Sequence, residues 1–511
     1  MTFEIIFVLL ALLGMVVALA LDKMRPGMVL FSVVVLFLCA GILTPKEMLE
    51  GFSNKGMITV ALLFLVSEGI RQSGTLGQVI KKLLPQGKTT VFKAQLRILP
   101  SVAFISAFLN NTPVVVIFAP IIKHWAKSVK LPATKFLIPL SYVTILGGIC
   151  TLIGTSTNLV VHGMILEAGY EGFTMFELGK VGIFIAIAGI IYLFIFSKRL
   201  LPDARPDTAV PDEEVEEGEK LHRVEAVLGA RFPGINKKLS DFNFQRHYGA
   251  EVKEIKTRNG QRYVDHLEDV VLREGDTLVV MADDTFIPTW GESSVFVLLT
   301  NGNDPDTSGK KKRWLALILL VLMIVGATVG ELPATKEMFP DIKLDMFFFV
   351  CITTIIMAWT NIFPARKYTK YISWDILITI ACAFAISKAM VNSGVADCVA
   401  GFIIGLSDDY GPHVLLAILF VITNLFTELI TNNAAAALAF PLALSISAQL
   451  GVSPTPFFVV ICMAASASFS TPIGYQTNLI VQGIGNYKFT DFVRIGLPLN
   501  IITFLISVIL I

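Results

Sequence analysis

The sequence predicts an α-helical polytopic membrane protein with two inverted repeats and a small α/β domain inserted between them. Apolar residues make up 54% of the 511 residues and charged residues 16%, whereas soluble domains carry roughly 25% charged residues. Many apolar runs reach about 17–20 residues, the length that crosses the hydrocarbon core of a bilayer. In addition, one phrase of polar residues occurs in both halves of the chain.

The first apolar run, residues 5–21, is expected to be a retained membrane span. Glu4 is the one charged residue before it, and the run is too long for the core of a signal peptide. The six cysteines are scattered without a CxxC spacing, so we expect neither disulfides nor a cysteine metal site. The net charge of +1 gives no support for nucleic-acid binding.

Composition divides the chain into three parts. Residues 1–200 and 310–511 are membrane-like, and residues 201–309 are polar. The polar part opens with an acidic linker, PDARPDTAVPDEEVEEGEK, and continues with strand-like pieces separated by turn residues: HRVEAVLG, AEVKEIKT, DVVLREG and DTLVVMA. We expect a small α/β domain over about residues 220–290.

The membrane-like parts contain a duplication. The phrase STPIGYQTNLIVQG at 470–483 is identical to CTLIGTSTNLVVHG at 150–163 in eight of fourteen positions. The segment LNNTPVVVIFAP at 109–120 likewise resembles TNNAAAALAFP at 431–441. Chance similarity of apolar helices explains matched Leu or Val, but not matched Asn, Thr and Gly in one register.

Loop charges predict that the two repeats are inverted. Basic loops mark the cytoplasmic side, and such loops lie on both sides of the apolar stretch 94–122. That stretch is therefore expected to be a re-entrant hairpin. The loops beside the second hairpin, 413–446, lack Lys and Arg, so it enters from outside. The pattern predicts about eleven transmembrane helices plus two hairpins, with both termini outside and the soluble domain in the cytoplasm.

The polar phrases interrupt predicted helices. Non-helical backbone at membrane depth survives where it is buried in protein or lines a wet cavity, and inverted repeats with broken helices are typical of secondary transporters. The hairpin tips at 110–112 and 431–433 and the breaks at 154–158 and 471–478 supply hydroxyls, amides and helix N-termini. Such groups can hold an anion and Na⁺. Polar contacts that merely join helices are the alternative, which four symmetric breaks disfavour.

Glu428 is an exception among these uncharged groups. It is an acidic residue that lies well inside the second hairpin, one turn before the tip. Such a carboxylate can relay protons, but the first hairpin has no matching acid. A structural or cation-tuning role is therefore favoured.

Both membrane halves resemble the divalent anion:sodium symporter family of the ion-transporter superfamily. Members of that family carry Ser-Asn-Thr at each hairpin tip, of which this chain keeps the central Asn. The motifs GTSTN and TPIGYQTN resemble the sulfate-permease branch, and the stretch from LGARFPG to LREGDTLVVMADD resembles its cytoplasmic TrkA-C domain. The resemblance implies an elevator-type homodimer in the plasma (inner) membrane, with Na⁺ as coupling ion and no organic cofactor.

Carried over by position, the resemblance also implies a set of ligands. One sodium site is implied near Ser106, Asn110, Asn111 and Gly154. A second sodium site is implied near Thr427, Thr431, Asn432 and Thr471. The anion is implied to touch Asn111, Thr112, Thr155, Ser156, Asn432, Asn433, Thr471 and Pro472.

The substrate is predicted from departures within the breaks. Dicarboxylate-type relatives carry Pro-Pro-Asn there, whereas this chain has Ser-Thr-Asn at 156–158 and Gln-Thr-Asn at 476–478. The bulkier Tyr475 and Gln476 would shrink the pocket and add donors, which favours sulfate over a C4-dicarboxylate. An ion antiporter and a TrkA-C-regulated channel are the alternatives of other classes. No enzyme motif such as HExxH or a P-loop occurs, and the soluble domain is a candidate for a small regulatory ligand or a dimer contact.

Overall fold

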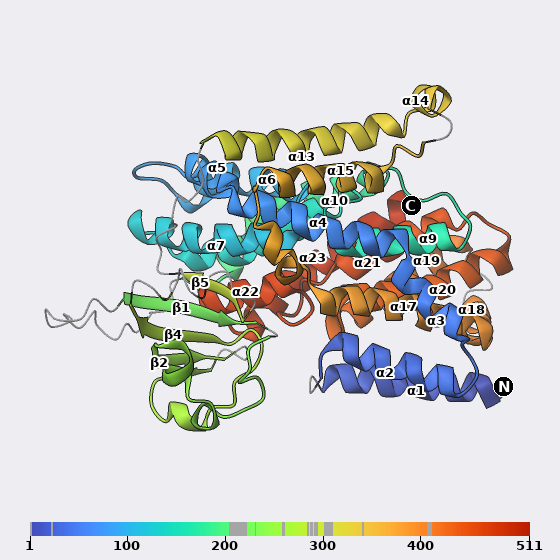
Figure 1. Ribbon diagram of the computed structural model, residues 1–511, viewed down its shortest axis with the longest axis horizontal. Helices are drawn as coiled ribbons and strands as arrows, with labels where there is room; N and C mark the ends of the chain where they lie inside the picture. The colour runs from blue at the N-terminus through green and yellow to red at the C-terminus, as the bar shows by residue number, and fades with distance from the viewer. Residues whose placement is uncertain are drawn as a thin grey trace, which may run out of the picture.

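The computed structural model describes the chain except residues 1–2, 22–23, 204–221, 230, 258–260, 284–285, 287–289, 291–294, 301–309, 340–341 and 406–410. Most of the expected acidic linker lies outside the described residues. The described residues form a helical membrane part and a β-sheet that lies at one end of it (Figure 1).

Two series of helices make up the membrane part. The first series is α1 (Phe3–Ala20), α2 (Pro26–Cys39), α3 (Pro45–Glu50), α4 (Lys55–Gln72), α5 (Thr75–Leu83), α6 (Val91–Ser106), α7 (Asn111–Ser128), α8 (Leu137–Gly148), α9 (Ser156–Glu167) and α10 (Gly179–Leu200). The second series is α13 (Lys310–Gly330), α14 (Pro333–Met338), α15 (Met346–Trp359), α16 (Tyr368–Tyr371), α17 (Trp374–Asn392), α18 (Val395–Gly405), α19 (Pro412–Leu429), α20 (Asn432–Leu450), α21 (Thr455–Ser466), α22 (Gln476–Gly485) and α23 (Phe489–Leu510).

Six of the helices in the described part are long and apolar enough to cross a membrane by themselves. The other apolar helices are shorter, and several of them end at the polar phrases. Thus α8 and α9 are separated by the backbone between Gly148 and Ser156, and α21 and α22 by the backbone between Ser466 and Gln476. This number is smaller than the eleven membrane spans that the sequence predicted, because a helix that is broken at membrane depth is too short to count as one continuous span.

Each interruption ends in a residue with extended backbone. Asn110 (φ −56°, ψ 141°) precedes α7, and Thr431 (φ −70°, ψ 147°) precedes α20. Thr155 (φ −140°, ψ 148°) precedes α9, and Tyr475 (φ −135°, ψ 132°) precedes α22. Extended φ/ψ at the N-cap lets the first N–H groups of a helix face away from the preceding chain. The four interruptions thus lie where the polar phrases predicted them.

The helices beside each tip form a hairpin. The indole Nε1 of Trp125, near the end of α7, donates to the carbonyl of Pro85, which precedes α6, at 2.9 Å. In the second series, Nε2 of Gln449 on α20 donates to the carbonyl of Asp397 on α18, the helix that precedes α19, at 3.2 Å. Each hairpin therefore returns toward the end at which it started. Figure 1 shows α7 and α20 at opposite ends of the membrane part.

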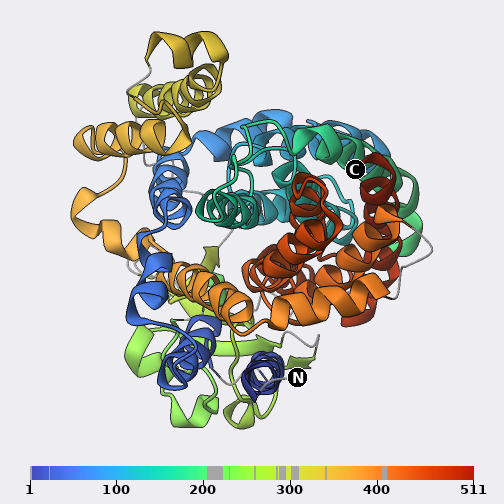
Figure 2. The ribbon, with the colours of Figure 1, turned by 90° about the vertical axis from the view of Figure 1, so that its right-hand side faces the viewer.

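The core lies around the broken helices. Every residue of α8 is buried, because α6, α7, α10 and α22 surround it. By contrast, residues 310–338, drawn in yellow in Figure 2, stand at the margin of the molecule. The outward face of α13 exposes large apolar side chains, namely Trp314, Ile318, Val321, Leu322, Val325 and Val329. Such a face is suited to lipid or to another helix.

The sheet has five strands in the order β3-β2-β4-β1-β5, and its pairings are antiparallel. The strands are β1 (His222–Leu228), β2 (Glu251–Lys256), β3 (Arg262–Tyr263), β4 (Thr277–Ala282) and β5 (Phe296–Thr300). Three of the four predicted strand pieces are present. The fourth, DVVLREG, was wrongly predicted, since Val271 makes only an isolated bridge there. The sheet also extends to β5, past residue 290.

The sheet packs directly on two helices that begin at interruptions. On α7, Nζ of Lys123 lies 2.9 Å from Oε1 of Glu225 on β1. On α22, Leu479 packs on the turn at Gly275, where an added Cβ would lie 3.4 Å from Leu479 Cδ2. Val227 of β1 is buried in the same apolar cluster as the membrane helices. The sheet is thus connected to the helices whose other ends form the candidate site.

Candidate functional site

One phenol connects the interruptions of the two series. The Tyr475 hydroxyl accepts a hydrogen bond from Nδ2 of Asn111 at 2.6 Å and lies 3.0 Å from Oγ1 of Thr155. The side chain of Asn432 lies close enough to interact with it as well. These residues come from both hairpin tips and both helix breaks, and all but the half-buried Asn432 are buried. The four interruptions therefore meet at Tyr475.

A pocket of closely packed oxygens lies beside the first tip. Oγ of Ser106 donates to Oδ1 of Asn111 at 2.8 Å. The glycines at 148 and 154 allow this approach: a methyl group on Gly148 would lie 2.6 Å from Asn111 Oδ1, and one on Gly154 would lie 2.4 Å from the carbonyl of Gly148. Three of the four residues implied for the first sodium site are thus brought together.

The second tip repeats this arrangement. Oγ1 of Thr427 lies 2.9 Å from Oδ1 of Asn432, as Oγ of Ser106 lies beside Oδ1 of Asn111, and 2.6 Å from the carbonyl oxygen of Ala465. A methyl group on Gly474 would lie 2.9 Å from the carbonyl of Thr427. Oγ1 of Thr431 is buried without a hydrogen-bond partner, and Oγ1 of Thr471 accepts from the N–H of Gly474 at 3.1 Å. Three of the four residues implied for the second sodium site, Thr427, Asn432 and Thr471, thus lie close together beside Gly474.

Two asparagines that were not among the implied ligands hold the break loops. Nδ2 of Asn158 donates to the carbonyls of Gly148 and Thr151 at 3.4 and 2.9 Å. Nδ2 of Asn478 donates to the carbonyls of Ser468 and Thr471 at 2.9 and 3.2 Å. The duplicated Thr-Asn of the repeated phrase is the sequence signal for this role, because an amide with two donor protons can hold two free carbonyls.

The remaining residues implied for the anion face one another across the two series. Oγ of Ser156 and Oγ1 of Thr157 each donate to Oδ1 of Asn433 at 3.2 Å. Oγ1 of Thr112 donates to Oε1 of Gln476, also at 3.2 Å. Gln476 is thus a further residue of the site. The first turns of α7, α9, α20 and α22 meet here, and their partial positive charges favour an anion.

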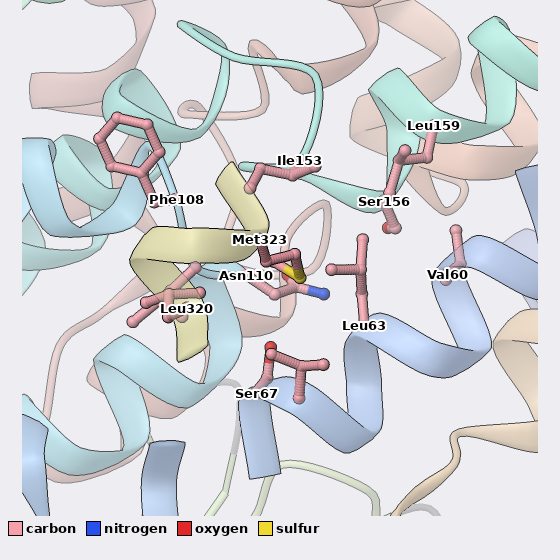
Figure 3. A pocket seen from close by; sticks show the side chains of 12 residues that line it. Val60, Leu63, Ser67, Phe108, Asn110, Ile153, Ser156, Leu159, Leu320 and Met323 are labelled. Atoms are coloured by element: carbon pink, nitrogen blue, oxygen red, sulfur yellow. The ribbon is translucent and has the colours of Figure 1, made fainter. Parts of the chain in front are cut away.

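Two implied residues lie differently. Asn110 is not hydrogen-bonded to Ser106 in the described structure, and its side chain lines a neighbouring pocket between the first tip, α4 and α13 (Figure 3). Ser156 also lines that pocket, whose other walls are largely apolar: Val60, Leu63, Val66, Ser67, Phe108, Leu109, Ile153, Leu159, Leu320 and Met323. Pro472 is buried in the loop between α21 and α22, where its carbonyl is its only polar group.

The chemistry of the site suits hard cations and an anion. Ser106 and Thr427 lie in the last turns of α6 and α19, where the partial negative charge of a helix end favours a cation. Within the described residues, no cluster of three or more His, Cys, Asp or Glu side chains forms a metal site. Hydroxyl, amide and carbonyl oxygens are the ligands that broken helices offer to Na⁺ in transporters.

Comparisons with known proteins find transporters. A family model described as a citrate transporter (CitMHS) matches residues 16–448 and 338–511. An uncharacterized transporter of Synechocystis, sll0640, is 29% identical over 92% of this chain and 90% of its own length. Sodium/sulfate cotransporter 2 of Chlamydomonas reinhardtii is 30% identical over 55% of this chain and 31% of its own length.

The fold is also similar to a solved structure. The crystal structure of the YdaH transporter of Alcanivorax borkumensis superimposes with a TM-score of 0.52 at 12% identity, over 91% of this chain and 86% of that chain. At this identity the likeness concerns the fold alone. The expectation of a transporter rather than an enzyme is confirmed, and so is the resemblance to the ion-transporter superfamily. The chain belongs to the citrate transporter (CitMHS) family.

Proposed function

We propose that the protein is a sodium-coupled importer of a divalent anion, with sulfate as the substrate. The observation that carries the proposal is the meeting of four helix interruptions at Tyr475, flanked by two matched oxygen pockets. Uncharged donors and helix N-termini suit the anion. The pockets at Asn111 and Asn432 suit Na⁺.

Coupling follows from the charges. In the described part of the chain, the hydrogen bonds of Tyr475, Asn111 and Thr155 come from uncharged groups and not from Lys or Arg. A divalent anion taken from water into such a site loses its hydration, and a nearby cation offsets that cost. The anion therefore binds well only after Na⁺ has bound beside it. This order prevents either ion from crossing alone.

The substrate assignment rests on the size of the site. The Tyr475 ring and the Gln476 amide occupy the space between the tips and add polar groups to it. This favours a compact tetrahedral oxyanion, and the naming of one relative as a sodium/sulfate cotransporter supports it. A C4-dicarboxylate is the second candidate substrate, which the naming of another relative as a sodium-dependent dicarboxylate transporter supports. An ion antiporter or a channel is the alternative of another class.

The proposal includes the arrangement of the two repeats in the membrane. Residues 1–200 and 310–511 act as inverted repeats, an arrangement that the matched extended residues at 110 and 431 and at 155 and 475 support. Hairpins 94–122 and 413–446 enter from opposite faces of the plasma (inner) membrane, with both termini outside. The transport part moves as an elevator within a homodimer, for which the exposed apolar face of α13 offers a surface.

The cytoplasmic domain, residues 201–309, has a regulatory role in this proposal. Its resemblance to TrkA-C domains and its packing on α7 and α22 support that role, because these two helices also reach the ion site. A small regulatory ligand that loosens the contact at Lys123 would free both helices to move. A passive spacer would need no such attachment.

A thermal-shift screen of the purified protein tests the proposal. Sulfate, thiosulfate, molybdate, succinate and citrate are each added in Na⁺ and in K⁺. A ligand that binds the folded state raises the melting temperature by mass action. We expect sulfate to raise it in Na⁺ and not in K⁺. A shift by succinate or citrate alone would move the assignment to carboxylates, and equal shifts in both salts would contradict sodium coupling.

A further inference from the structure

The helices α13 and α15 pack together at the margin of the molecule (Figure 2), and one end of this pair is basic. Nζ of Lys312 on α13 donates to the carbonyl of Asn361, which follows α15, at 3.1 Å. Oγ1 of Thr75, at the start of α5, donates to the carbonyl of Arg313 at 3.5 Å. Three segments distant in sequence therefore meet here and are called the basic end: residues 71–93, 310–313 and 359–374.

The segments of the basic end carry cations and no acid. Residues 71–93 contain five Lys or Arg, residues 310–313 four and residues 359–374 three, and no Asp or Glu occurs in any of them. At the opposite end of the pair, residues 331–345 contain four Asp or Glu and two Lys. In the described part of the chain, no salt bridge involves Arg366 or Lys370. An excess of positive charge therefore lies at one end of the pair.

An apolar stripe on α15 leads to the basic end. Its side chains recur at helical spacing and are exposed: Ile352, Ile355, Ile356 and Trp359. From Ile352 to Trp359 the helix rises about 10 Å, which fits within one leaflet, half of a hydrocarbon core of about 30 Å. Trp359 is 84% exposed, and tryptophan is enriched at the boundary between hydrocarbon and headgroups. The stripe is thus suited to acyl chains, and the basic end to the headgroup above them.

We propose that the α15 stripe and the basic end bind an anionic phospholipid, with its phosphate beside Arg366 and Lys370. A zwitterionic lipid would cover the stripe equally well, but an anionic headgroup also neutralises the excess positive charge. The site uses α15 and leaves the exposed face of α13 for a second protomer. Because α15 packs on α4, and α4 packs on α9, the bound lipid supports a helix next to the candidate site. The inference does not depend on which ion is transported.

Quenching of Trp359 fluorescence by brominated lipids tests the proposal. The full-length protein is reconstituted into phosphatidylcholine bilayers that contain increasing fractions of brominated phosphatidylglycerol or, in parallel, of brominated phosphatidylcholine. The difference between each protein and its Trp359→Phe variant gives the signal of Trp359. We expect phosphatidylglycerol to quench this signal at a lower mole fraction than phosphatidylcholine. We also expect added salt to reduce this preference, because it screens the charges.

Arg366→Gln combined with Lys370→Gln is expected to lower the preference about twenty-five-fold, because each cation beside an anionic surface contributes about fivefold in affinity. The matched control is Lys336→Gln combined with Lys343→Gln, which removes the same charge from exposed residues at the opposite end. The control should keep the wild-type preference.

Three results would overturn the proposed lipid site. Equal quenching of the wild-type protein by the two lipids would mean that the headgroup is not recognised. Protection of Trp359 from both lipids would mean that a second copy of the chain covers the stripe. Equal losses in the two double variants would mean that the charge of the whole protein, and not the basic end, attracts the lipid.

Discussion

Nδ2 of Asn111 lies 2.6 Å from the hydroxyl of Tyr475, across 364 residues of sequence. This hydrogen bond joins the first hairpin tip to the break of the second series, and Thr155 adds the break of the first series at 3.0 Å. A hydroxyl that is already surrounded by the residues implied for the anion is well placed to donate to that anion. Its removal leaves the ring, and so the shape of the site, in place.

Tyr475→Phe is therefore expected to weaken anion binding while the fold is retained. Loss of one hydrogen bond to a charged ligand costs about 1.5–3 kcal/mol, so the half-saturating anion concentration should rise roughly ten- to a hundredfold. Uptake at saturating Na⁺ measures it. Tyr192→Phe is the control, since the Tyr192 hydroxyl donates to the carbonyl of Ile495 between α10 and α23 at 3.0 Å. Equal effects in the two variants would show that Tyr475 has only a structural role.

The paired hydroxyls beside the tips predict the Na⁺ dependence. Ser106→Ala and Thr427→Val each remove an oxygen that is bonded to a tip asparagine. We expect each to raise the half-saturating Na⁺ concentration about tenfold, as the loss of one polar contact implies. Ser101→Ala and Thr423→Val are matched controls on the same helices, because within the described residues their hydroxyls bond to the carbonyls of Arg97 and Leu419 alone. Variants and controls that behave alike would remove the two pockets as Na⁺ sites.

A methyl group at Gly154 tests the close packing of the first pocket. It would lie 2.4 Å from the carbonyl of Gly148 and 2.7 Å from its Cα, and backbone atoms cannot move away as a side chain does. Gly154→Ala is expected to destabilise the protein by about 1–3 kcal/mol, as overpacking does, and to abolish stabilisation by Na⁺. Gly14→Ala on α1 meets nothing within 4 Å and should leave the melting temperature and Na⁺ dependence intact. A fully Na⁺-responsive Gly154→Ala protein would contradict this packing.

The contact between Glu225 and Lys123 predicts a pH dependence for docking of the sheet. Burial alone would raise the pKa of Glu225, but the charges of Lys123 and Lys256 outweigh it and lower the pKa from 4.5 to about 2. Because the pKa is lower in the folded protein than in the unfolded chain, the stabilisation is complete above pH 4.5 and is lost as the pH falls from there toward 2. Hydrogen exchange of the α7 amides near Lys123 should accelerate within that window.

Glu225→Gln is expected to accelerate the same exchange at neutral pH, since it removes the charge while keeping the shape. The control is Asp269→Asn, which breaks the exposed pair with Lys238 at 3.1 Å. Exposed pairs contribute about 0–1 kcal/mol, so the control should exchange as the wild-type protein does. Identical α7 exchange in all three proteins would mean that the ion pair does not hold the sheet on the membrane helices.

The sequence predicted the features that repeat and missed those that join different parts of the chain. Polar residues inside apolar runs marked the interruptions, and the family resemblance implied the pairs Ser106–Asn111 and Thr427–Asn432, which the structure brings into contact. The central role of Tyr475 was not predictable, because Thr155 occupies the matched position and the partner Asn111 is distant in sequence.

The packing of the sheet was missed for the same reason. The sequence placed Lys123 in a basic loop and Glu225 on a strand-like piece, and only the fold brings them together. The strand predicted over DVVLREG followed its run of β-branched and apolar residues, but the chain there pairs only at Val271. The local sequence pattern therefore specified where helices break. The contacts between the two series of helices, and between the helices and the sheet, are set by tertiary packing.

Uptake of labelled sulfate into proteoliposomes, with an inward Na⁺ gradient or an equal K⁺ gradient, measures the proposed transport directly. We expect saturable accumulation above the outside concentration that requires the Na⁺ gradient, collapses when the gradient is dissipated, and is competed by unlabelled sulfate. Uptake of the same extent in K⁺, or equilibration without accumulation, would contradict sodium-driven transport through this site.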